Sequence, residues 1–108
     1  MLIEKTKMVK NALLTVPVDV FHYYAKNKPD QYVVWAETGE EESVNADDHK
    51  YIQTIVGTVT YFTKSENDEN ADRIQDALKE NGISFFLDDV RYDENTGYIQ
   101  YVWEFKVM

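Results

Sequence analysis

The chain has 108 residues, a length typical of one domain, and its 44% hydrophobic content is too high for a disordered segment. Twenty acidic and eleven basic residues give a formal net charge of −9, which disfavours direct binding to nucleic acid phosphates and anionic membranes. The absence of cysteine excludes disulfides, thiol nucleophiles and Cys-ligated zinc, and no apolar run reaches the ~20 residues that span a bilayer. We therefore expect a soluble protein, made in a reducing cytoplasm.

The first half of the chain predicts one helix and two strands ahead of an acidic segment. Apolar residues at helical spacing predict a short helix over residues 2–14, which Pro17 ends. β-branched and aromatic residues predict strands at Val18–Tyr24 and Gln31–Glu37, joined by a polar turn. The following segment contains six acids with Glu37 and no Lys or Arg, which is typical of an exposed loop at about 38–49.

The middle of the chain predicts a long strand and then the clearest helix. Both alternate faces of residues 50–64 carry apolar side chains, so we expect part of this strand to be covered on both sides. Gly57 in its middle indicates a bulge or a close backbone approach. Ser65 is the expected N-cap of the helix, Asp68 stands at the capping-box position, and Asn81-Gly82 ends it.

Two further strands are predicted at the end of the chain. They cover residues 83–92 and 98–107, and a short polar loop that ends in glycine joins them. The element order is then α-β-β-β-α-β-β. This order predicts an α+β fold in a single domain, 1–108, with an antiparallel sheet of about four to five strands and two helices packed on it.

No set of residues in the sequence is arranged for catalysis. The two histidines are His22, in a predicted strand, and His49, after the acidic loop, and neither accompanies a nucleophile motif. We interpret His22 as a strand side chain half covered by its neighbours. Asp47, Asp48 and His49 are adjacent, and adjacent residues rarely point at one ion. We therefore expect no enzyme activity, no cofactor and no metal site.

Protein contacts are the remaining role for the acidic segment and the aromatic residues. The acidic segment is either a solvated loop or an arm that orders against a basic partner, with a neighbouring subunit as the favoured target. A domain this small would struggle to bury eight Tyr, five Phe and two Trp, so we expect some of them in a subunit interface. The candidate contact residues are Trp35, Glu37, Glu40, Glu41, Glu42, Asp47 and Asp48.

A linked series of segments resembles the tail-completion and tail-terminator proteins of long-tailed phages and prophages. The series is VPVDVFHYYAKNKPDQYVVWAE at 16–37, GTVTYFTKSENDENADRIQDAL at 57–78 and IQYVWEFKV at 99–107, after an N-terminal helix. Its most specific part is a strand, then Thr-Lys, an acidic helix start and the helix pattern Ile-Gln-x-x-Leu. The resemblance covers nearly the whole chain.

The resemblance implies a structural virion protein with no catalytic or cofactor residues. Members of that family form rings, commonly hexamers, that cap the finished tail tube and join it to the head. The implied partners are further copies of the chain, the tail tube protein and the head completion or connector protein, with no membrane and no sequence-specific nucleic acid. The implied location is the virion, and the host cytoplasm during assembly. DNA would pass through the ring, where like charge prevents sticking.

Other functions stay open at this point. An acidic phage-encoded inhibitor or DNA mimic that binds a host protein would need carboxylates spaced on a rigid surface like duplex phosphates. The densest acidic run lies in a predicted loop, which disfavours that interpretation. A small enzyme and a generic binding module are the remaining alternatives.

Overall fold

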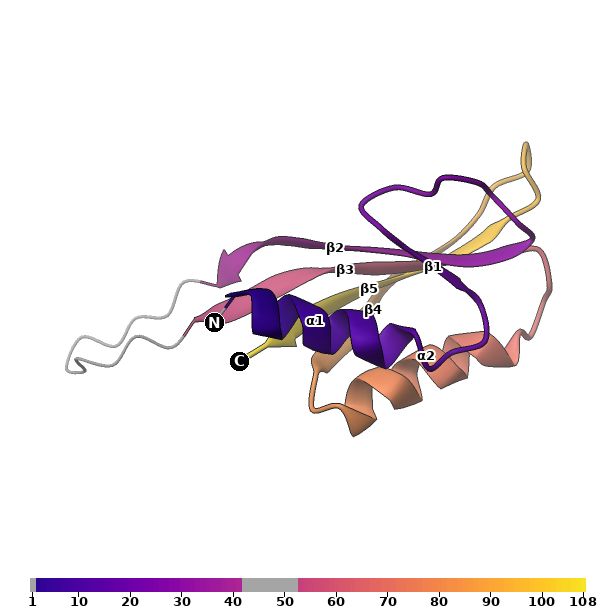
Figure 1. Ribbon diagram of the computed structural model, residues 1–108. Helices are drawn as coiled ribbons and strands as arrows, with labels where there is room; N and C mark the ends of the chain where they lie inside the picture. Colours follow the sequence, from indigo (N-terminus) through magenta and orange to yellow (C-terminus); the bar gives the residue numbers. More distant parts are fainter. Residues whose placement is uncertain (1, 42–52) are drawn as a thin grey trace.

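A computed structural model describes residues 2–41 and 53–108, and it contains two helices and five strands in the predicted order. Figure 1 shows the two helices side by side on one face of the sheet. Each helix has an apolar stripe that must be covered, and both helices cover it by packing on this face. The elements are α1 (Leu2–Leu13), β1 (Asp19–His22), β2 (Gln31–Glu41), β3 (Thr54–Thr63), α2 (Glu69–Glu80), β4 (Ser84–Tyr92) and β5 (Ile99–Val107).

The sheet is mixed, with the strand order β1-β2-β3-β5-β4. Four strands pair antiparallel, as predicted, but β1 pairs parallel with β2. A parallel neighbour needs a connection that returns across the sheet. Here that connection is the segment between β1 and β2, which arches over the side of the sheet away from the helices (Figure 1). The hydroxyl of Tyr98 fastens it there by donating to the carbonyl oxygens of Lys28 and Pro29.

The core lies between the helices and one face of the sheet. In β3 the residues with odd numbers are buried and face the helices, while those with even numbers from Val56 to Phe62 are partly covered on the other side. Apolar burial of this kind stabilises the fold by about 25 cal/mol per Å². The largest fully buried side chains are Trp103, Tyr61, Phe105, Leu13, Ile74 and Leu78.

The position of Gly57 suggested a bulge or a close backbone approach, and the structure has both. A Cβ at this residue would fall 2.5 Å from Cζ of Phe105 and closer still to the carbonyl oxygen of Ala36. The opposing strand also has a bulge there, because the register with β3 shifts between Glu37 and Gly39. The lack of a side chain at Gly57 therefore lets β2 and β5 approach β3 in the middle of the sheet.

The acidic loop predicted at 38–49 is wrong in its first part. Strand β2 continues to Glu41, so residues 38–41 belong to the hairpin with β3, and Glu40 and Glu41 pair with Ile55 and Thr54. Cross-strand pairing with apolar and β-branched residues outweighs the low strand propensity of glutamate. The remainder of the predicted loop lies outside the described residues.

The predicted N-cap of the second helix also needs correction. Helix α2 begins at Glu69 and its N-cap is Asp68, whose side chain accepts a hydrogen bond from the backbone N of Asn70. Ser65 lies in the preceding turn, where its backbone N donates to the hydroxyl of Thr63. Asp68 replaces it because three side-chain donors converge on the Asp68 carboxylate at the end of the sheet. These donors are Gln31, Tyr61 and Thr63.

Candidate assembly interface

The predicted contact residues divide between the core and the surface. Trp35 is 2% exposed and packs within the core, which corrects its prediction as a contact residue. Glu40 and Glu41 are exposed at the end of β2, and Oε1 of Glu41 lies 2.6 Å from Nζ of Lys106. Glu42, Asp47 and Asp48 lie outside the described residues.

Glu37 forms a cluster with the end of β1. Its Oε2 lies 2.7 Å from Nε2 of His22, and its Oε1 accepts from the hydroxyl of Tyr23. The imidazole of His22 is stacked between two rings, Tyr23 at 3.8 Å and Trp35 at 3.9 Å between centroids. The interpretation of His22 as a half-covered strand residue is confirmed, since its side chain is 38% exposed. The cluster fastens the short strand β1 to β2.

Charge state in this cluster follows from the same contacts. Burial raises the pKa of the Glu37 carboxyl, but the hydrogen bonds from Tyr23 and His22 outweigh it, and the pKa lies below its ordinary value. The pKa of Tyr23 is raised, chiefly because its hydroxyl donates to that carboxylate. Because an ionised carboxylate only accepts, His22 donates from Nε2. We call this cluster of His22, Tyr23 and Glu37 the latch, because its hydrogen bonds join the end of β1 to β2.

Strand β4 carries a candidate contact surface that the sequence did not predict. It is an outer strand of nine residues and carries four exposed large hydrophobic side chains. Their exposed fractions are 50% for Phe86, 46% for Leu87, 49% for Val90 and 65% for Tyr92. A long outer strand with exposed apolar residues is a template for contact with another chain.

A bulge in β4 sets which way these side chains point. The register with β5 shifts between Leu87 and Asp89, so that Leu87 pairs with Trp103 and Val90 with Tyr101. Trp103 belongs to the core under the helices, and directly paired residues share a face. Leu87, Val90 and Tyr92 therefore lie on the helix side of the sheet. Regular alternation of side chains along the strand would place Leu87 and Val90 on opposite sides of the sheet. No pattern in the sequence predicts the bulge.

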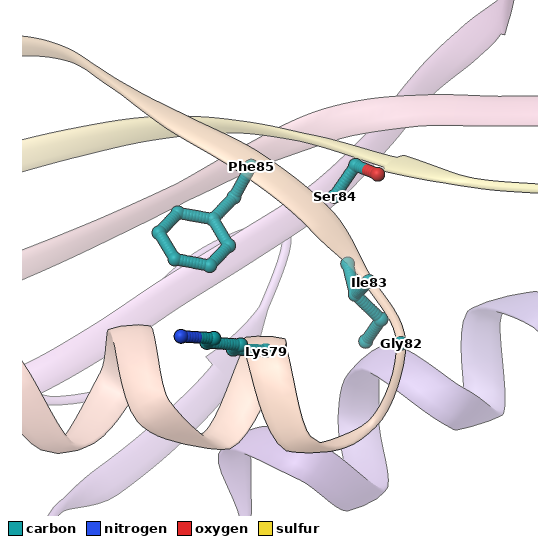
Figure 2. Close-up of a pocket in the computed structure, with 5 residues that line it drawn as sticks. All are labelled: Lys79, Gly82, Ile83, Ser84 and Phe85. Carbon is teal, nitrogen blue, oxygen red and sulfur yellow. The ribbon is translucent and has the colours of Figure 1, made fainter.

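Helix α2 contacts β4 but leaves its residues Leu87, Val90 and Tyr92 exposed. On its flank towards β4, Gln75 accepts from Nε1 of Trp103, which fixes the helix over β5. Beyond it lies a hollow of about 420 Å³, lined by Lys79, Gly82, Ile83, Ser84 and Phe85. Figure 2 shows the ring of Phe85 and the side chain of Lys79 on opposite sides of this hollow, joined by the turn at Gly82 and Ile83.

Within the described residues 2–41 and 53–108, no three side chains of His, Cys, Asp or Glu group as ligands for a metal ion. In the same part of the chain, neither helix has the length and apolar character needed to cross a membrane. The arrangement of exposed apolar side chains on β4 is therefore the feature of the described surface that most resembles a site of contact.

Comparison with family models and with curated proteins gave no match to this sequence. Among solved structures, the chain is similar to a sheath/tube terminator of the PVC extracellular contractile injection system, determined by cryo-EM in the extended state. The match covers 99% of this chain, with a TM-score of 0.61 and 11% sequence identity. The chain spans about half of that protein, 55% of its length. At this identity the likeness shows a shared fold.

Proposed function

We propose that this chain is a tail terminator, a structural subunit that closes the tube of a phage or phage-like tail. The observation that carries the proposal is the fold. Nearly the whole chain superposes on a protein whose role is to terminate a sheath and tube. The independent resemblance of the sequence segments to phage tail-terminator proteins supports the same role.

The surface of the chain supports assembly as its mode of action. A subunit that exposes Leu87, Val90 and Tyr92 on the helix side of one outer strand leaves a patch that a neighbouring molecule would cover. We propose that copies of the chain form a closed ring, commonly a hexamer in the family that it resembles. One side of the ring would meet the tail tube protein and the other the head completion or connector protein.

The same proposal includes the absence of enzymatic activity. His22 stacks on Tyr23 and donates to Glu37, and we assign it the structural role of fastening β1 in the latch. The net charge of −9 suits a ring through which DNA passes, because like charges repel. The protein would then be found in assembled particles.

Particle morphology after gene deletion tests the role. A tube that lacks its terminator has no signal to stop growing, so deletion should give tails of irregular and excessive length that carry no heads. Negative-stain electron microscopy measures tail length, and an antibody against the chain should label one end of the tail in the parent strain. The wild-type gene supplied from a plasmid serves as the control and should restore uniform tails.

Two results would refute the proposed function. One is normal, headed tails in the deletion strain together with absence of the chain from purified particles. The other is saturable turnover of a small molecule by the purified protein that is lost in His22→Ala.

A further inference from the structure

The helix side of β4 has room for a third helix. Helices α1 and α2 lie on one face of the sheet (Figure 1), and the position of α2 over Trp103 leaves Leu87, Val90 and Tyr92 exposed on that face. Phe85, at the start of the strand, packs against the core and marks where the covered part ends. A helix laid along β4 at this point would continue the layer that α1 and α2 begin.

Helix α1 carries a surface that matches this position. Its buried residues Val9, Ala12 and Leu13 face the core. On the opposite side Ile3, Lys7 and Lys10 follow at helical spacing, and the exposed Leu14 just after the helix extends the stripe. Two apolar side chains thus flank two lysines in a stripe that points away from the protein.

Charge separates these two surfaces. Helix α1 contains three lysines and one glutamate, a net charge of +2 in a chain whose total is −9. The segment 66–94, which holds α2 and β4, contains ten acidic and three basic residues, a net charge of −7. Within the segment, Asp72 and Asp76 are exposed on α2, and Asp88 is exposed at the bulge of β4. Opposite charge on two different surfaces of one chain favours contact between successive copies.

We propose that α1 of one copy packs on the helix side of β4 of the next copy. Ile3 and Leu14 contact Leu87, Val90 and Tyr92, and Lys7 and Lys10 face the acidic residues of the segment 66–94. The contact joins two different surfaces, so it is heterologous and repeats from copy to copy until a ring closes. It rests on the proposed function, because it names the surfaces through which the terminator subunits meet.

The contact between α1 and β4 is more favourable than a symmetric contact between the β4 strands of two copies. Two β4 strands that met across a twofold axis would bring Asp88 and the acidic flank of α2 towards the same groups of the partner. Such like-charge contact opposes association. In the heterologous contact each acidic surface meets the basic element of the chain, and the apolar side chains of both surfaces are covered together.

Cysteine cross-linking tests the contact directly, because the natural chain has no cysteine. Asn11→Cys, beside the stripe of α1, and Val90→Cys, in β4, are made in separate proteins. A mixture of the two should give a covalent dimer with a short bis-maleimide, whereas each protein alone should stay a monomer on a denaturing gel. Glu104→Cys is the matched control for Val90→Cys, since it is exposed on the face away from the helices, and its mixture with Asn11→Cys should give no dimer.

Charge reversal provides a second measurement. The double variant Lys7→Glu/Lys10→Glu should weaken self-association about tenfold or more in analytical ultracentrifugation, and Lys7→Arg/Lys10→Arg should leave it unchanged. Adding Asp76→Lys/Asp88→Lys to the first variant should restore association.

Three outcomes overturn the inference: a chain that is monomeric at every concentration, a Val90→Cys protein that cross-links to itself, or an Asn11→Cys and Glu104→Cys dimer as abundant as the Val90 one. A tube protein or another strand seated on β4 would be recognised by loss of the Val90 cross-link in its presence. Each of these leaves the role in tail termination standing, because that role is judged by tail length and particle labelling. A strict monomer would in addition contradict the proposed ring.

Discussion

Two carboxylates, those of Asp68 and Glu37, accept hydrogen bonds from side chains of the sheet. Asp68 lies between the sheet and α2, and Glu37 lies where β1 ends. Each accepts a hydrogen bond from a tyrosine hydroxyl, and each has a pKa below its ordinary value because its donors outweigh the effect of burial. The donors to Asp68 are the side chains of Gln31 at 2.8 Å, Tyr61 at 2.5 Å and Thr63 at 2.6 Å, with the backbone N of Asn70 at 2.9 Å.

The difference between the two lies in what surrounds the donors. Tyr61 and Thr63, which donate to Asp68, are wholly buried, whereas Tyr23, which donates to Glu37, is mostly exposed. Water can replace a lost partner at the surface but not in the interior, so the same chemical group stabilises the fold strongly in one place and weakly in the other. Asp68 therefore fixes the fold, and Glu37 fixes the position of the outer strand.

Removal of the interior carboxylate should have the largest effect. We expect Asp68→Ala to lower the free energy of unfolding by about 2–4 kcal/mol, because it removes the N-cap of α2 and leaves buried hydroxyls without an acceptor. Urea unfolding followed by circular dichroism measures it. The matched variant Asp30→Ala removes an exposed acid whose ion pair with Lys64 spans 3.6 Å, and it should change stability by less than about 0.5 kcal/mol. Equal losses in the two variants would contradict the assigned role of Asp68.

The tyrosine in the same cluster should limit stability at high pH. Burial, and then the hydrogen bond to Asp68, raise the pKa of Tyr61 from 10.0 to about 12. The stability that this hydroxyl gives is complete below pH 10, where the unfolded chain holds the proton, and is lost as the pH rises through about 12. The melting temperature of the wild type should therefore fall faster over this range than that of Tyr61→Phe. Parallel curves for the two proteins would show that Tyr61 is not responsible.

The sequence predicted the parts of this fold that depend on local spacing. The element order, the apolar stripe of α2 and the close approach at Gly57 all follow from residues near one another in the chain. The N-cap at Asp68 did not, because its selection depends on donors from β2 and β3 that only the folded sheet brings together. The exposed apolar side of β4 depends on a bulge at Asp88, and the parallel pairing of β1 depends on a connection held by Tyr98.

Low pH should weaken the stabilisation that Asp68 gives more than the stabilisation that Glu37 gives. We expect this difference to be smaller than the effects above. A carboxyl whose pKa is lowered on folding stabilises the protein above its unfolded pKa of about 3.9 for Asp, and this contribution disappears as the pH falls through the folded value. The difference in melting temperature between the wild type and Asp68→Asn should therefore shrink between about pH 5 and pH 2. The corresponding difference for Glu37→Gln should shrink less. A gap for Asp68→Asn that stays constant over this range would exclude ionisation as the cause of its effect.

The surface carboxylate should give the smallest change in stability and a local change in structure. We expect Glu37→Gln to lower the free energy of unfolding by less than about 1 kcal/mol, since the amide keeps one acceptor and water reaches the cluster. Its effect should instead appear at β1, where the stack of Tyr23, His22 and Trp35 loses the charge that holds it in register. Hydrogen exchange should become faster at the amide of Tyr23, which donates to the carbonyl oxygen of Trp35, and stay slow in β3. Because β1 and β4 are opposite edges of the sheet, self-association through β4 should be unaffected, and a loss of it in Glu37→Gln would mean that the latch and the assembly surface are not independent.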